Sequence, residues 1–229
     1  MTDPASPCHA APYGNVWWVT SSARRARLSA ADWAEAALAA MAEGGPAAVA
    51  VEPLAVRLGA TKGSFYWHYR NRDALIQAAL ELWERRSTEE IIALVGVHDD
   101  PRAQLRDLFA RVIGFAGRTP LETRLVAATD QPAVAEVVRR VVQRRVAFVI
   151  GLFEQAGFSP QQAARRGILT YAGYTGHDQL AGQLPGVLPL DAAGGLRGYV
   201  DGVLDLVLDA QAAPEAEQGH DRPSSRTNR

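Results

Sequence analysis

The sequence has very little of what several classes of protein require. Cys8 is the single cysteine among 229 residues, so neither an intrachain disulfide nor a cysteine-rich metal site can form. No stretch approaches the roughly 18 uninterrupted apolar residues of a membrane-spanning helix. The N-terminal residues also lack the charged start and apolar run of a signal peptide. We therefore expect a cytoplasmic protein without a membrane partner.

Sequence signatures of catalysis are missing as well. The chain contains no phosphate-binding glycine loop, no H-E-x-x-H zinc motif and no G-x-S-x-G nucleophile motif. Its five histidines are scattered along the chain and do not have the spacing of metal ligands. We therefore expect no enzymatic activity, no catalytic residue, no bound metal and no cofactor.

Excess charge of one sign is also absent. The chain has 24 basic and 25 acidic residues, and Lys62 is its single lysine. Near neutrality argues against a protein that coats nucleic acid indiscriminately, but it leaves room for a local basic surface. A hydrophobic content of 48% indicates a globular protein with a substantial core.

Aromatic residues make up only 7% of the chain, yet four of them and a histidine occupy residues 65–69. A helix beginning near Lys62 would place Phe65 and Tyr69 one turn apart, on a face that can meet a core. The other three side chains of the run would then project away from that face. Rings with hydrogen-bond donors suit contact with sugar, phosphate and base edges. A packed aromatic cluster inside a helical domain is the alternative.

Two further helices are predicted immediately before this run. Ser29 is a suitable N-cap for a helix over residues 30–43, with an apolar stripe of Trp33, Ala37, Leu38 and Met41. A short helix over 51–58 follows, with Val51, Leu54, Ala55 and Leu58 on one face. Gly59 then allows the positive φ that favours a helix end. A helix, a short turn and a second helix form the pattern of a helix-turn-helix, whose second helix enters the DNA major groove.

The residues of this pattern resemble the signature of TetR-family transcriptional repressors. The similarity consists of Gly59, the run Gly63–Tyr69 and the run Asn71–Leu75. The chain departs from the family pattern at two positions. Ala50 replaces the usual Ser or Thr cap, and Arg72 replaces the late lysine but keeps its charge. The resemblance implies a double-stranded DNA operator, homodimerisation through the last two helices and release by an unknown small-molecule effector bound among the middle helices.

Roles on DNA follow from position along the recognition helix. Lys62, Gly63 and Ser64 lie at its N-terminal end and are predicted to read base edges. Thr61, just before them, is also predicted to contact DNA. Four other residues are predicted to hold sugar and phosphate, namely Tyr66, Trp67, His68 and Arg72. Phe65 and Tyr69 are assigned to the core of the head. The basic cluster Arg24-Arg25-Ala26-Arg27 is either a solvated charge run or an arm that contacts phosphate or the minor groove.

The pattern of the rest of the chain predicts a helical bundle, so the predicted fold class is all-α. Further helices are expected at residues 72–95, 102–117, 121–130, 132–156, 160–184 and 194–212. The predicted division is a mobile N-terminal arm (1–23), a three-helix DNA-binding head (24–73), a helical effector-binding and dimerisation domain (74–212) and a disordered tail (213–229). Arg139, Arg140, Arg144 and Arg145 are expected on a solvated or ion-paired face.

Effector contacts are predicted from the resemblance, and no motif marks them. The expected apolar lining is Phe109, Ile113, Phe148, Leu152 and Tyr171, with Thr129, Asp130 or His177 as polar contacts. Core packing is the alternative role for each of these residues. The predicted function is therefore a homodimeric DNA-binding repressor. The alternative is an all-α small-molecule-binding protein or enzyme whose head no longer binds DNA.

Overall fold

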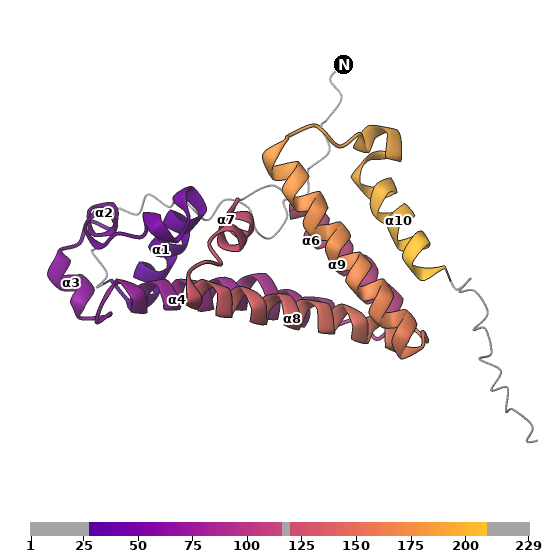
Figure 1. The fold of residues 1–229 in the computed structure, drawn as a ribbon, viewed down its shortest axis with the longest axis horizontal. Coiled ribbons are helices and arrows are strands. Elements are labelled where there is room, and N and C mark those ends of the chain that lie inside the picture. The colour runs from indigo at the N-terminus through magenta and orange to yellow at the C-terminus, as the bar shows by residue number, and fades with distance from the viewer. Residues whose placement is uncertain (1–27, 116–119, 210–229) are drawn as a thin grey trace, which may run out of the picture.

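The computed structural model describes residues 28–115 and 120–209, and this part of the chain is built of helices and their connections without any strand. The predicted arm at 1–23, the arginines Arg24, Arg25 and Arg27 and the predicted tail at 213–229 lie outside it. Figure 1 shows a small head at one end of the molecule and the last two helices at the other. The predicted all-α fold is confirmed.

Three helices build the head: α1 (Ala30–Gly44), α2 (Val51–Arg57) and α3 (Lys62–Tyr66), with a 3₁₀ turn η1 (Pro46–Ala48) after α1. Ser29 caps α1 as predicted. The cap is reinforced because the Asp32 carboxylate accepts a hydrogen bond from the Ser29 N–H at 2.7 Å. Gly59 has a φ of 62° in the turn between α2 and α3, which only glycine adopts easily. Ala50 gives α2 no side-chain cap.

A long helical segment leads away from the head. It consists of α4 (Arg72–Glu84), a π-helical turn η2 (Arg85–Glu89) and α5 (Glu90–Val95). The predicted helix over 72–95 is therefore present, but the sequence did not indicate the π turn. In this turn the N–H of Glu90 donates to the carbonyl of Arg85, five residues back, so the helix carries an extra residue.

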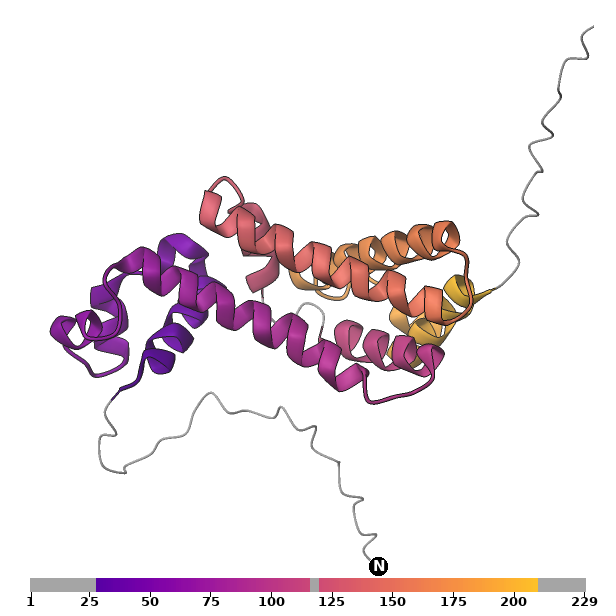
Figure 2. The same ribbon diagram turned by 90° about the horizontal axis from the view of Figure 1, so that it is seen from below.

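Five helices complete the bundle: α6 (Pro101–Phe115), α7 (Leu121–Ala127), α8 (Pro132–Gln155), α9 (Pro160–Gln183) and α10 (Gly195–Leu208), with a 3₁₀ turn η3 (Leu190–Ala193) before α10. In Figure 2, α4 and α8 run side by side along the molecule. α9 packs on α8, α10 packs on α6, and α7 packs on α1 of the head. Among the described residues, no helix is long and apolar enough to cross a membrane.

The buried apolar residues form two clusters. The first joins the head to α4, α7 and the first half of α8, and includes Trp33, Phe65, Leu75 and Val141. The second joins α6, the second half of α8 and α10, and includes Phe109, Phe153 and Leu204. Because α8 contributes to both clusters, it links the head end of the molecule to the far end.

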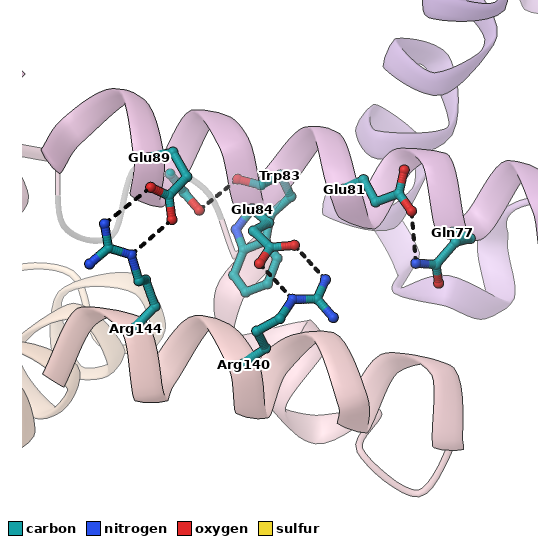
Figure 3. A network of polar contacts seen from close by, with 8 residues as sticks. Gln77, Glu81, Trp83, Glu84, Glu89, Arg140 and Arg144 are labelled. Carbon is teal, nitrogen blue, oxygen red and sulfur yellow. Dashed lines mark hydrogen bonds and ion pairs between the residues drawn. The ribbon is translucent and has the colours of Figure 1, made fainter. Parts of the chain in front are cut away.

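Arginines of α8 pair with glutamates of the long helical segment. Arg140 Nε donates to Glu84 Oε1 at 2.7 Å, and Arg144 Nε donates to Glu89 Oε1 at 3.2 Å (Figure 3). These pairs confirm the ion-paired face for Arg140 and Arg144. Both arginine side chains are almost half exposed, so each pair contributes little to stability. Arg145 turns inward instead.

Gly167 of α9 lies against the backbone of α8. A Cβ at Gly167 would come within 2.5 Å of Ile150 Cγ1 and 3.2 Å of Ile150 N. We predict that Gly167→Ala lowers the free energy of unfolding by about 1–3 kcal/mol, because one helix must shift to admit the methyl group. Chemical denaturation measures this change.

The matched control is Gly151→Ala in α8, where an added Cβ would have no described atom within 4 Å apart from the adjoining backbone of α8 itself. That substitution should stabilise the chain by up to about 1 kcal/mol through helix propensity. Equal gains in stability at the two positions would show that α8 and α9 do not approach closely at Gly167.

Candidate functional site

The aromatic run of the head divides between its core and its surface. Phe65 is fully buried and meets Trp33 edge-on, with ring centroids 5.4 Å apart. Tyr69 stacks on Phe65, and its hydroxyl donates to the carbonyl of Ala30 at 2.7 Å. Trp67, by contrast, is 81% exposed. An indole ring held in solvent at this level indicates a contact surface, because water solvates it poorly.

Five of the residues predicted to contact DNA line one surface hollow of about 470 Å³, together with Leu28: these are Thr61, Gly63, Ser64, Trp67 and His68. Thr61 shapes the hollow because its hydroxyl accepts a hydrogen bond from the Ser64 N–H at 3.2 Å and caps α3. Among the described residues beyond its immediate neighbours, a Cβ at Gly63 would meet only the Thr61 hydroxyl, at 3.7 Å. The fold itself therefore does not require glycine here, and the surface stays open to close approach.

Lys62 is paired with Glu52 of α2, a residue that the sequence analysis did not single out. Lys62 Nζ lies 2.8 Å from Glu52 Oε1 on the surface of the head. This hydrogen bond raises the pKa of Lys62 and lowers the pKa of Glu52. Glu52 therefore holds the predicted base-reading lysine and also puts a negative charge where DNA phosphates would approach. The two residues are ten positions apart, and only the turn between α2 and α3 brings them together.

Arg72 has a structural role in addition to its predicted contact with phosphate. Its Nε donates to the carbonyl of Val49 and its Nη2 to the carbonyl of Pro46, both at 2.6 Å. Its Nη1 lies 3.9 Å from Asp73. Arg72 thus ties the start of α4 to the connection between α1 and α2. Its contact with DNA stays a prediction.

A second site lies within the bundle, where η2, α5, α6, α8 and α9 enclose a cavity of about 70 Å³. Three of the predicted effector contacts line it: Phe109, Phe148 and Tyr171. The structure therefore brings part of the predicted lining together.

The other five predicted contacts lie elsewhere. Ile113 and Leu152 are buried in the second apolar cluster. The His177 ring stacks on Tyr199 of α10 with centroids 5.4 Å apart. Thr129 is exposed after α7, and its hydroxyl donates to the carbonyl of Val126. Asp130, the further polar candidate, is also exposed there. For Ile113 and Leu152, the core-packing alternative describes the observed position.

The polar lining of the cavity was missed by the sequence analysis, and its centre is Arg145. This side chain is only 12% exposed, and its Nη1 donates to Glu122 of α7 at 2.7 Å. Its Nε donates to the Thr88 hydroxyl at 3.0 Å, and its Nη2 donates to the Ser87 hydroxyl at 3.0 Å. Burial alone would lower the pKa of Arg145, but the attraction of Glu122 and its neighbours raises it. The guanidinium therefore stays charged inside the protein.

The fold and the recognition surface define the class of the protein. A capped short helix follows a glycine turn and exposes Trp67 on a three-helix head, which is the arrangement of a helix-turn-helix DNA-binding protein. The family model described as "Bacterial regulatory proteins, tetR family" matches residues 34–79. Residues 34–79 therefore contain the helix-turn-helix domain of TetR-family transcriptional regulators.

Several solved structures share the fold of this chain. A TetR-family transcriptional regulator from Streptomyces coelicolor is 20% identical with a TM-score of 0.64, and the match covers 78% of this chain and 95% of that chain. A TetR transcriptional regulator from Legionella pneumophila is 12% identical with a TM-score of 0.61, covering 75% and 94%. The reduced form of NemR from E. coli is 14% identical with a TM-score of 0.60, covering 78% and 94%. At these identities the similarity establishes the fold alone. No curated protein sequence matches the chain significantly.

We predict that Lys62→Ala weakens binding to the preferred DNA sequence roughly 5- to 150-fold, because one hydrogen bond to a base edge is lost. The loss should be much smaller on a sequence altered at the base pair that Lys62 reads. Fluorescence anisotropy on a panel of single-base-pair variants measures both effects.

Glu52→Gln is the matched control, because it frees Lys62 and removes the neighbouring negative charge without removing the lysine. This variant should bind all sequences more tightly, and the gain should shrink as salt rises. An equal loss of affinity on every sequence for Lys62→Ala would mean that Lys62 contacts only phosphate.

Proposed function

We propose that this TetR-family regulator is a homodimeric repressor that a small molecule releases from its operator. The observation that carries the proposal is the exposed surface of α3, where Trp67 and Lys62 face solvent beside an open hollow. Lys62, Gly63 and Ser64 would reach base edges, while Tyr66, Trp67, His68 and Arg72 would hold the backbone. The proposed boundaries are residues 24–73 for DNA binding and 74–212 for the effector and the partner subunit.

An apolar stripe on α9 supports the homodimer. Leu169 is 66% exposed, and Leu180 is exposed further along the same face of the helix. Gly173 and Gly176 lie between them on that face, at helical spacing. Apart from the adjoining backbone of α9 itself, no atom of the described residues lies within 4 Å of a Cβ built at either glycine. Apolar side chains flanking small residues allow a second helix to approach closely. A two-fold axis at this position would pack the apolar stripe of one subunit against the same stripe of the partner subunit.

Contacts of η2 support release by a ligand. Arg86 of this turn forms a two-pronged ion pair with Glu35 of α1 in the head. The next two residues, Ser87 and Thr88, contact Arg145 at the cavity. A ligand that binds one arrangement of η2 more tightly would therefore shift the population of head positions. Two heads displaced in this way would no longer fit successive major grooves, about 34–36 Å apart.

Selection of bound sequences from random duplex DNA tests the proposed function. The full-length chain should enrich a two-fold symmetric sequence with two half-sites, because each subunit presents one α3. Leu169→Glu should make the chain monomeric in light scattering and abolish the enrichment of paired half-sites, because it places a charge in the apolar stripe.

Val97→Glu is the control for that variant, since Val97 is 74% exposed after α5 and lies outside α9 and α10. It should leave both the dimer and the selected sequence unchanged. Absence of any enriched sequence with the unaltered chain would refute the DNA-binding function. A dimer that survives Leu169→Glu would refute the interface on α9.

A further inference from the structure

The cavity contains a hydroxyl group that no described residue satisfies. Thr170 of α9 lines the cavity and is 7% exposed, and its Oγ1 is buried without a hydrogen-bond partner in residues 28–115 and 120–209. Thr175, five residues later in α9, shows the usual solution, because its hydroxyl donates to the carbonyl of Tyr171 at 3.0 Å. A buried hydroxyl without a partner is costly. A bound molecule with an oxygen atom near Thr170 would remove that cost.

The charge at the cavity is already balanced. Arg145 contributes one positive charge, and Glu122 neutralises it at 2.7 Å. An anionic ligand would place a second negative charge beside the Glu122 carboxylate around one guanidinium, in a region with little water. Burial raises the pKa of Tyr171 and Tyr174, and the nearby charge of Arg145 opposes this only in part. Both phenols therefore stay neutral near pH 7, and the charge of Arg145 in the lining is balanced by Glu122 behind it.

The remaining walls are apolar and the space is small. Ile91, Phe109, Val112, Phe148 and Val149 supply side chains that offer no hydrogen bond. The volume of about 70 Å³ is less than the roughly 150 Å³ of an engineered apolar cavity that binds benzene. The cavity is open on one side and adjoins a second hollow of about 250 Å³ that Arg145 and Tyr174 also line, so a single-ring molecule can extend from one space into the other.

We propose that this cavity binds a neutral, mainly apolar molecule of one ring or less, whose single oxygen atom hydrogen-bonds with the Thr170 hydroxyl. Binding of this molecule does not depend on the proposed function. Only its role as the effector rests on that function. Arg145 acts as a positioning residue, because its bonds to η2 and to Glu122 fix one wall of the cavity without the help of the ligand.

Titration calorimetry on the full-length chain tests this with three probes of similar shape: phenol, toluene and benzoate at pH 7.5. Phenol should bind most tightly, and benzoate at least about tenfold more weakly than phenol because of its charge. Thr170→Val, which has nearly the same shape, should weaken phenol binding roughly 2- to 12-fold. The same variant should leave toluene binding unchanged, and thermal unfolding checks that it is folded.

Three results would overturn the inference: benzoate binding more tightly than phenol, Thr170→Val weakening phenol and toluene equally, or no binding of any probe. Thr170→Ser, which keeps the hydroxyl, should retain the preference for phenol over toluene.

Measuring whether each probe displaces the selected DNA separates this inference from the proposed function. Phenol that binds without displacing DNA would refute release while leaving the ligand class intact. DNA released by benzoate but not by phenol would refute the ligand class while leaving the repressor intact.

Discussion

The structure of the bundle depends on one buried guanidinium. Arg145 joins three elements that are distant in the sequence: α8, which carries it, α7 through Glu122, and η2 through Ser87 and Thr88. An arginine removed from water is stable only while its charge and its donors are matched, so these partners must stay in place. The exposed pairs of Arg140 and Arg144 on the same helix have no such requirement. Arg145 therefore fixes how the long helical segment lies against α8 and keeps the cavity neutral.

This constraint places the two sites on the same elements. The turn η2 faces the cavity with Thr88 and faces the head with Arg86, which pairs with Glu35. Glu122 belongs to α7, which packs on α1. Two routes thus lead from Arg145 to the head, one through η2 and one through α7. The proposed release requires only that a ligand in the cavity changes the balance between arrangements of these contacts. The π turn suits that role, because its extra residue marks a place where the helix can be rearranged locally.

The sequence predicted the head well because its signals are local. Ser29 before the first helix, Gly59 in the turn and the spacing of Phe65 and Tyr69 each depend on neighbours within a few residues. The cavity depends on contacts between residues far apart in the chain. In the sequence Arg145 resembles Arg139, Arg140 and Arg144, and only its packing against Thr88, 57 positions away, distinguishes it. Periodicity likewise places Leu152 and Phe148 on similar faces, but the first fills the core and the second lines the cavity.

A double-mutant cycle on Arg145 and Glu122 tests most directly whether this buried pair holds the bundle together. Arg145→Met and Glu122→Gln should each lower the free energy of unfolding by about 3–5 kcal/mol, because each leaves a buried group without its partner. The double variant should lose less than the sum, with a coupling of roughly 0.5–3 kcal/mol. The equivalent cycle on the exposed pair Arg144 and Glu89 should give no more than about 1 kcal/mol. Additive effects at Arg145 and Glu122 would contradict the account.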